Sequence, residues 1–120
     1  MKKTLPILLL LLLLVACSSS NTYENVNNEG AKALIDDGKV EVIDVRTPEE
    51  FAEGHIPEAS LVPLNELEAR ISELDKDKPY LLVCRSGNRS AQAADILLKK
   101  GFTNLYNLQT GMSQWPYEVE

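Results

Sequence analysis

Short apolar runs alternate along this chain with segments in which apolar residues recur every three or four positions. Runs rich in β-branched or other apolar residues, bounded by turn residues, are typical of buried strands. One run contains two prolines, which favours an edge strand or an extended connection over a central strand. The strands predicted in this way fall within residues 23–26, 40–45, 56–64, 80–83 and 102–108.

Helices are predicted in the intervals between these strands. The first is capped by Asn27 or Asn28, and a brief second one begins at a capping box formed by Thr47 and Glu50. The others cover residues 66–74, about 90–100 and a short segment around 112–115. Strands that alternate with helices indicate an α/β fold: one domain with a mainly parallel sheet of about five short strands and helices on both faces.

The first 16 residues have the pattern of a signal peptide. A charged start precedes the apolar run 5–16, which is too short for a membrane span of about 20 residues. Its end, Leu14-Val15-Ala16-Cys17, resembles the lipobox of bacterial lipoproteins, which implies a lipid anchor on Cys17. The alternative is an ordinary export signal that leaves Cys17 as a free thiol. We expect a signal peptide (1–16), a lipidated tether (17–26) and one domain (27–120).

This organisation predicts a location in the cell envelope. Ser18 after the lipobox favours an outer membrane facing the periplasm, where the host has one. Loss of residues 1–16 removes two lysines and changes the formal charge from −6 to −8. An acidic domain without a basic stripe is not expected to bind nucleic acid, and it contacts the membrane only through its anchor. We expect a monomer.

A cysteine stands where the predicted strand 80–83 ends and a tight turn leads into a helix. With Cys17 lipidated, Cys84 has no partner in the chain, and an unpaired thiol in an oxidising compartment is a candidate reactive group. Free N–H groups at the helix start, together with Gly87, which permits positive φ, can converge on its sulfur. This arrangement lowers a thiol pKa and predicts a nucleophile. The alternative is an inert buried thiol.

The loop Cys84-Arg85-Ser86-Gly87-Asn88-Arg89-Ser90 resembles that of a single-domain rhodanese, a sulfurtransferase. The similarity extends from about Asn25 to Trp115 and includes three further motifs in the same order: Val42-Ile43-Asp44-Val45-Arg46-Thr47-Pro48-Glu49-Glu50-Phe51, Gly54-His55-Ile56-Pro57 and Gly111-Met112-Ser113-Gln114-Trp115. Two positions depart from the family pattern, because Glu58 and Thr110 stand where glycine is usual.

The resemblance implies a reaction in two displacements. Cys84 attacks the outer sulfur of an anionic donor such as thiosulfate and becomes a persulfide, and cyanide or a thiol then removes that sulfur. No metal or organic cofactor is required. The substrate-binding residues are predicted to be Arg85, Ser86, Gly87, Asn88, Arg89 and Ser90.

Several of these residues have a second interpretation. Arg85 is expected to contact the donor anion, whereas Arg89 is equally suited to holding the loop, and Ser90 is alternatively only the helix cap. Asp44 and Arg46 are expected to form a structural ion pair rather than to catalyse. His55, the only histidine, is assigned to a structural corner, and Met112 and Trp115 to the core.

Two other functions remain open. Cysteine-based phosphatases and arsenate reductases share a similar loop but place five residues between cysteine and arginine, whereas four separate Cys84 from Arg89 here. The tighter loop favours a single sulfur atom over phosphate. The second alternative is a lipid-tethered sulfur carrier or docking module without turnover; docking domains of this family commonly lack the cysteine.

Overall fold

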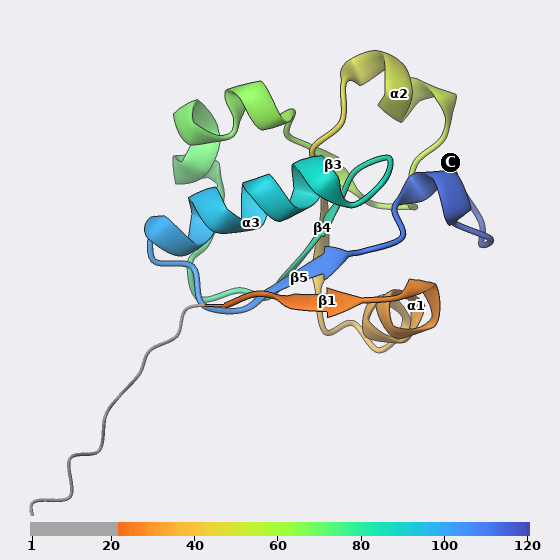
Figure 1. Ribbon diagram of the computed structural model, residues 1–120, viewed down its shortest axis with the longest axis horizontal. Coiled ribbons are helices and arrows are strands. Elements are labelled where there is room, and N and C mark those ends of the chain that lie inside the picture. The colour runs from red at the N-terminus through yellow and green to blue at the C-terminus, as the bar shows by residue number, and fades with distance from the viewer. Residues whose placement is uncertain (1–21) are drawn as a thin grey trace, which may run out of the picture.

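The computed structural model describes residues 22–120, so the predicted signal peptide and Cys17 lie outside the described residues. Five strands form one sheet in the order β1-β5-β4-β2-β3, and every neighbouring pair is parallel (Figure 1). The strands are β1 (Glu24–Val26), β2 (Glu41–Asp44), β3 (Ser60–Leu61), β4 (Tyr80–Val83) and β5 (Leu105–Leu108). The predicted α/β fold with five short parallel strands is confirmed.

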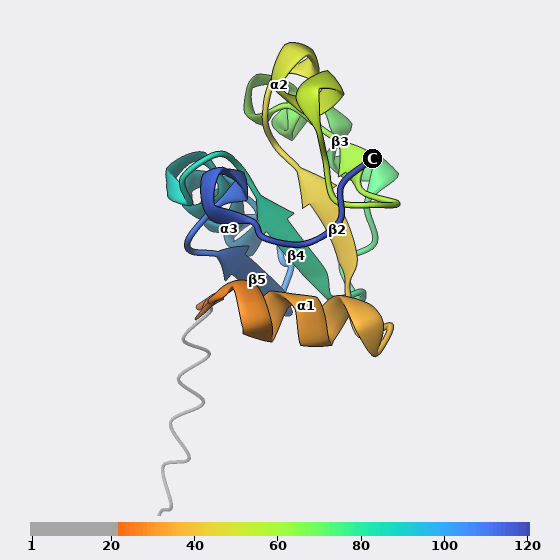
Figure 2. The ribbon, with the colours of Figure 1, turned by 90° about the vertical axis from the view of Figure 1, so that its right-hand side faces the viewer.

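Helices cover both faces of this sheet, as the turned view makes plain (Figure 2). They are α1 (Asn28–Asp36), α2 (Pro48–Glu53) and α3 (Asn88–Lys99), with the 3₁₀ helices η1 (Leu64–Glu66), η2 (Glu68–Glu73) and η3 (Met112–Gln114). Asn27 caps α1, and the capping box of Thr47 and Glu50 is present at α2. No helix within residues 22–120 is long and apolar enough to cross a membrane.

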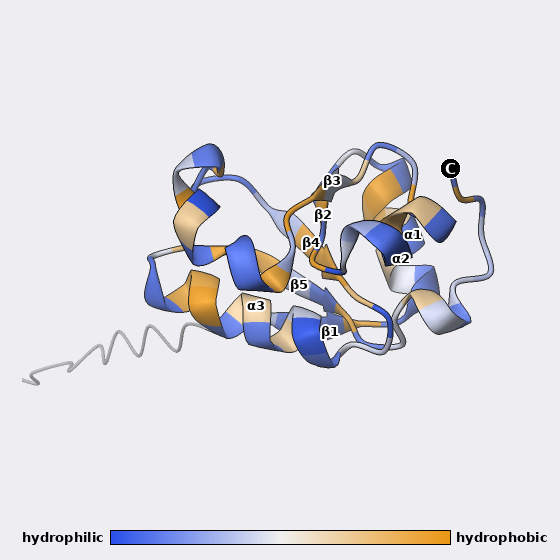
Figure 3. Cartoon of the chain, turned by 90° about the horizontal axis from the view of Figure 1, so that it is seen from above, coloured by the Kyte–Doolittle hydropathy of each residue, from blue (hydrophilic) through white to orange (hydrophobic). Residues whose placement is uncertain are grey.

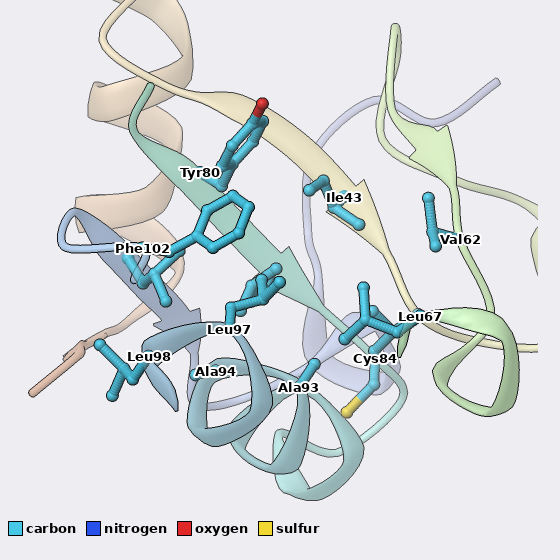
Figure 4. Packing of buried hydrophobic residues seen from close by; sticks show 13 residues of the cluster. Ile43, Val62, Leu67, Tyr80, Cys84, Ala93, Ala94, Leu97, Leu98 and Phe102 are labelled. Atoms are coloured by element: carbon cyan, nitrogen blue, oxygen red, sulfur yellow. The ribbon is translucent and has the colours of Figure 1, made fainter. Parts of the chain in front are cut away.

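Alternation along β4 divides the core into two layers. Tyr80, Leu82 and Cys84 face α3, where they pack with Leu97 (Figure 4). Leu81 and Val83 face the opposite side, where α1 packs. Figure 3 shows apolar residues along the strands and polar ones on the outer sides of the helices. The same alternation therefore directs the Cys84 side chain towards the start of α3.

The segment after β3 differs from its prediction. Residues 66–74 were expected to form one amphipathic α-helix, but Glu66 ends one 3₁₀ helix and residues 68–73 form a second, with Leu67 between them. A 3₁₀ helix rises about 2.0 Å per residue against 1.5 Å for an α-helix. Because it covers more distance per residue, the 3₁₀ conformation lets this short connection return from the end of β3 to the start of β4 while Leu67 stays buried.

Two further local features bear on the predictions. Gly87, not Ser90, is the residue that caps α3, so the interpretation of Ser90 as the cap is wrong. Glu58 has φ +68°, the left-handed conformation that glycine adopts without strain. The family turn is thus kept at this position despite the missing glycine, at the cost of a strained glutamate.

Candidate active site

Parallel strands bring the segments that follow β2 and β4 to one edge of the sheet. The Cys84 loop begins at the end of β4, and the Asp44–Arg46 pair and α2 follow β2. Ligands of open parallel sheets bind at this edge, beyond the carboxyl ends of the strands. The predicted catalytic loop and the predicted structural motif are therefore neighbours.

Hydrogen-bond donors converge on the Cys84 sulfur. The Gly87 N–H donates to Sγ over 3.1 Å, and the Ser90 hydroxyl lies 3.2 Å from it. Burial raises the pKa of the thiol, but the Ser90 hydroxyl and the main-chain N–H groups of Ser90, Ser86 and Gly87 stabilise the thiolate. The net result is a Cys84 pKa below its ordinary value. Cys84 is 0% exposed, so the surrounding chain covers its sulfur in this structure.

Two glycines allow the loop to lie against the chain that follows β5. Gly87 has φ +91°, and a Cβ there would meet the Gln109 carbonyl oxygen at 2.3 Å. Gly111 has φ +71°, and its Cβ would lie 2.2 Å from the Arg85 oxygen. The Met112 N–H donates to the Cys84 carbonyl over 2.8 Å, which completes the contact. The close approach explains why both positions need glycine.

Asn107, a buried residue of β5, supports the loop from behind and was not identified from the sequence. Its side-chain Nδ2 donates to the Gly87 carbonyl over 3.3 Å and to Asn25 over 3.0 Å. Gly87 is thus held at its carbonyl oxygen while its N–H donates to the sulfur. A polar residue inside an otherwise apolar strand was the only signal in the sequence.

The two arginines of the loop have different surroundings. Arg89 donates both terminal nitrogens to the Glu50 carboxylate, at 2.7 and 2.8 Å, which lowers the Glu50 pKa to about 2. This pair connects α3 with α2 and was not foreseen, because its partners are 39 residues apart. Arg85 is exposed and forms no ion pair within the described chain. Ser86 and Asn88 are exposed on the same rim. Substrate binding by these residues stays a prediction.

The expected ion pair between Asp44 and Arg46 is present and buried. Arg46 Nη2 lies 2.7 Å from Asp44 Oδ2, and Nε lies 3.0 Å from both carboxylate oxygens. The remaining donor capacity of Nη2 is used by the Gly54 carbonyl at 2.8 Å. Every described contact of this pair fixes the chain around α2, in agreement with a structural role.

His55 is likewise engaged by the scaffold. Its ring stacks on Phe51 with centroids 3.7 Å apart, and Nδ1 donates to the Phe51 carbonyl over 2.9 Å. Its main chain pairs with that of Glu120 through two hydrogen bonds. These contacts hold the corner after α2 and bring the C-terminal segment beside it.

Two clefts flank the loop, one beside each arginine. The larger, of about 410 Å³, is lined by Arg85, Glu53, Met112 and Trp115 among others. The smaller, of about 320 Å³, includes Arg89. Met112 and Trp115 pack partly against the core, as expected, and they also line the larger cleft. Within residues 22–120, no group of three His, Cys, Asp or Glu side chains is placed to hold a metal ion.

Comparisons with known proteins agree with this geometry. The family model described as the rhodanese-like domain matches residues 27–118. The uncharacterised protein YqhL of Bacillus subtilis is 46% identical over 82 residues, which cover 68% of this chain and 65% of YqhL, less than two thirds of its length. The thiosulfate sulfurtransferase GlpE of Pseudomonas aeruginosa is 33% identical over 80% of this chain and 86% of its own.

Solved structures give the same result for the fold. A rhodanese-like domain protein from Staphylococcus aureus superimposes with a TM-score of 0.75 at 32% sequence identity. The match covers 81% of this chain and 96% of that protein. The fold is therefore shared along nearly the whole described domain.

Proposed function

Because the chain belongs to the rhodanese-like domain family, we propose that it is a sulfurtransferase that carries sulfane sulfur on Cys84. The Cys84 thiolate attacks the outer sulfur of thiosulfate, forming a new S–S bond while the S–S bond of thiosulfate breaks. The bonding electron pair leaves with sulfite. Cyanide or a thiolate then attacks the outer sulfur of the persulfide and regenerates the Cys84 thiolate.

One observation carries this proposal: the Gly87 N–H and the Ser90 hydroxyl both lie within hydrogen-bond distance of Sγ. Donors placed in this way stabilise an anion on sulfur, and the persulfide formed in the first step is also an anion. The same donors can serve both states, because the thiolate and the persulfide each carry one negative charge on sulfur. The Arg85 guanidinium, which is exposed beside the larger cleft, is suited to hold the donor anion.

The same geometry favours sulfur transfer over phosphate chemistry. A phosphatase loop needs its arginine for the substrate oxyanion, whereas the Arg89 fork is occupied by Glu50. The presence of Cys84 in a loop with converging donors favours sulfur chemistry over a pure docking role.

The test compares two rates on soluble protein that begins at Ser18, a form that retains all of residues 22–120. We expect sulfite release from thiosulfate with cyanide as acceptor, and no hydrolysis of a phosphate ester. Intact mass after thiosulfate treatment should show one added sulfur. Hydrolysis of the ester would favour the phosphatase, and the absence of an adduct with any sulfane donor would favour the docking role.

We also propose that the mature protein is anchored in the cell envelope by lipid on Cys17, facing the periplasm from an outer membrane where the host has one. Several acyl chains together give stable anchoring, since each buried methylene contributes about 0.8 kcal/mol. Cys17→Ser is expected to release the protein from membranes and leave its activity in solution unchanged. Membrane retention of this variant would mean that the signal stays uncut.

A further inference from the structure

We infer that the domain is held at its membrane by the edge of the sheet where the strands begin, with the Cys84 loop facing water, so that its sulfur donor and acceptor are water-soluble. This inference rests on the lipid anchor proposed above and adds an orientation to it. Two independent observations carry it: the topology of the sheet and the distribution of charge.

The topology places the first described residue far from the catalytic loop. All five strands run in the same direction, so β1 begins at the edge opposite the Cys84 loop (Figure 1). The register puts Glu24 level with Tyr106 and Leu81. Along the strand direction, Thr22 therefore lies five residues before Cys84. It also lies two strands to the side, because it leads into β1 and not β4, so the two residues are about 19 Å apart.

The length of chain between anchor and domain limits how the domain can turn. Five residues lead from Cys17 to Thr22, and these span at most about 18 Å when fully extended. With the strands upright and the Cys84 loop on the bilayer, Thr22 would stand about 17 Å above it, since it lies five residues before Cys84 along the strand direction. Only an almost fully extended connection reaches that far, and extending it costs about 1–2 kcal/mol per residue. The opposite orientation requires no extension.

The charges of the domain favour the same orientation. Three segments lead into β2, β4 and β5 at the edge where the strands begin: residues 37–40, 74–79 and 99–104. They hold three acidic residues and five exposed lysines: Lys39, Lys76, Lys78, Lys99 and Lys100. Glu24 and Glu41 begin β1 and β2 at the same edge, and Lys78 forms an ion pair with Glu41 at 3.1 Å. This lysine edge therefore has no net charge, whereas the rest of residues 22–120 holds five cationic and thirteen acidic residues. An anionic bilayer repels the rest of the domain more strongly than the lysine edge.

The orientation determines which partners can reach the sulfur. Anionic donors and thiols dissolved in the aqueous compartment meet the Cys84 loop directly. A thiol carried on a lipid headgroup lies at the opposite end of the domain. The anchor then concentrates the enzyme at the membrane without making membrane components its substrates.

The only tryptophan of the chain provides a natural probe of this orientation. Trp115 lines the cleft beside Arg85, at the end of the domain that we expect to face water. The lipidated full chain is bound to vesicles of brominated phosphatidylcholine with or without phosphatidylglycerol, and its fluorescence is measured. We expect Trp115 to keep its emission, and soluble acrylamide to quench it as in solution. The matched reporter, Thr103→Trp with Trp115→Phe, places an indole at the lysine edge and should lose most of its emission.

The charge contribution appears in the comparison of the two vesicle types. The difference in quenching between the two reporters should be larger with phosphatidylglycerol, because the anionic lipid repels the acidic part of the domain that holds Trp115. Equal quenching of both reporters, or stronger quenching of Trp115, would overturn the inference.

A second measurement tests the consequence for partners. Full-length protein bound to vesicles and loaded with sulfur should transfer it to a soluble thiol as fast as the Cys17→Ser variant does, and not to a thiol on a lipid headgroup. Transfer to the lipid thiol would contradict the orientation. Failure of the full chain to float with vesicles would overturn both anchor and orientation. The sulfurtransferase proposal is decided separately, by thiosulfate turnover in solution.

Discussion

Two segments at the same edge of the sheet hold their polar groups in different ways. The segment after β2 pairs its charges among themselves and with α3: Asp44 with Arg46, and Glu50 with Arg89. The loop after β4 surrounds Cys84 with neutral donors, and no cationic side chain within residues 22–120 forms a hydrogen bond with the sulfur. A buried ion pair fixes the scaffold because removing one of its charges is costly. The neutral donors around Cys84 can instead stabilise its sulfur both as thiolate and as persulfide.

This comparison assigns chemistry to the Cys84 loop and support to the α2 segment. Substitutions in the loop should therefore change the reaction, whereas substitutions in the α2 segment should change the free energy of unfolding.

Cys84→Ser should abolish sulfur transfer and leave the fold intact. The two side chains are nearly isosteric, but a hydroxyl is not ionised at neutral pH and cannot form a persulfide. Intact mass after thiosulfate treatment should show one added sulfur on the wild type and none on the variant. A large fall in melting temperature would contradict the division, because it would make Cys84 a structural residue first.

Gly87→Ala should disrupt the loop itself. The new Cβ would lie 2.3 Å from the Gln109 carbonyl oxygen, so the main chain must move and carry the Gly87 N–H away from the sulfur. Displacement of catalytic groups by about 1 Å can reduce a rate by about 10²-fold. The matched control is Gly38→Ala, which shares positive φ at +66° but has open space around its Cβ. The control should lose some stability and no activity per folded molecule.

Asp44→Asn should destabilise the protein more than it slows the reaction. It leaves the Arg46 guanidinium buried without its carboxylate, and breaking a buried pair in this way costs about 3–5 kcal/mol. Urea unfolding measures the loss, with the exposed Glu49→Gln on α2 as the control. A variant of unchanged stability whose transfer rate collapses would give Asp44 a part in catalysis.

The sequence predicts the features that neighbouring residues determine, and it misses those that depend on distant segments. Strand β4 and the position of Cys84 were predictable, because an apolar run followed by a glycine-containing turn is a local signal. The Asp44–Arg46 pair was also predictable, since its partners are two residues apart. By contrast, the partner of Arg89 and the support from Asn107 depend on segments that meet only in the folded sheet.

The role of Ser90 was only half predicted, and for a related reason. The sequence placed it near the helix start, where a serine is normally a cap. The cap is Gly87 instead, which moves Ser90 into the first turn of α3 and aims its hydroxyl at the sulfur. A helix start three residues earlier thus excludes the alternative that Ser90 is only a cap, and leaves it a candidate functional residue, as the loop motif predicts.

Ser90→Ala is expected to have the smallest effect of the series, and its pH dependence identifies the cause. The Cys84 pKa is lowered in part by the Ser90 hydroxyl, so the rate of alkylation by neutral iodoacetamide should rise with pH earlier than for free cysteine. Removal of the hydroxyl raises the thiol pKa and moves this rise to higher pH. A hydrogen bond worth about 1 kcal/mol predicts a loss of about fivefold at neutral pH.

The loss should shrink at high pH, where the thiolate forms without help. The control is Ser86→Ala in the same loop, because Ser86 acts on the sulfur through its main-chain N–H, which alanine retains. An equal loss at every pH would mean that Ser90 only positions the loop. An unchanged pH dependence of alkylation would mean that the main-chain donors alone stabilise the thiolate. The Cys84 loop would then differ from the ion-paired α2 segment through its main-chain N–H groups and not through the Ser90 side chain.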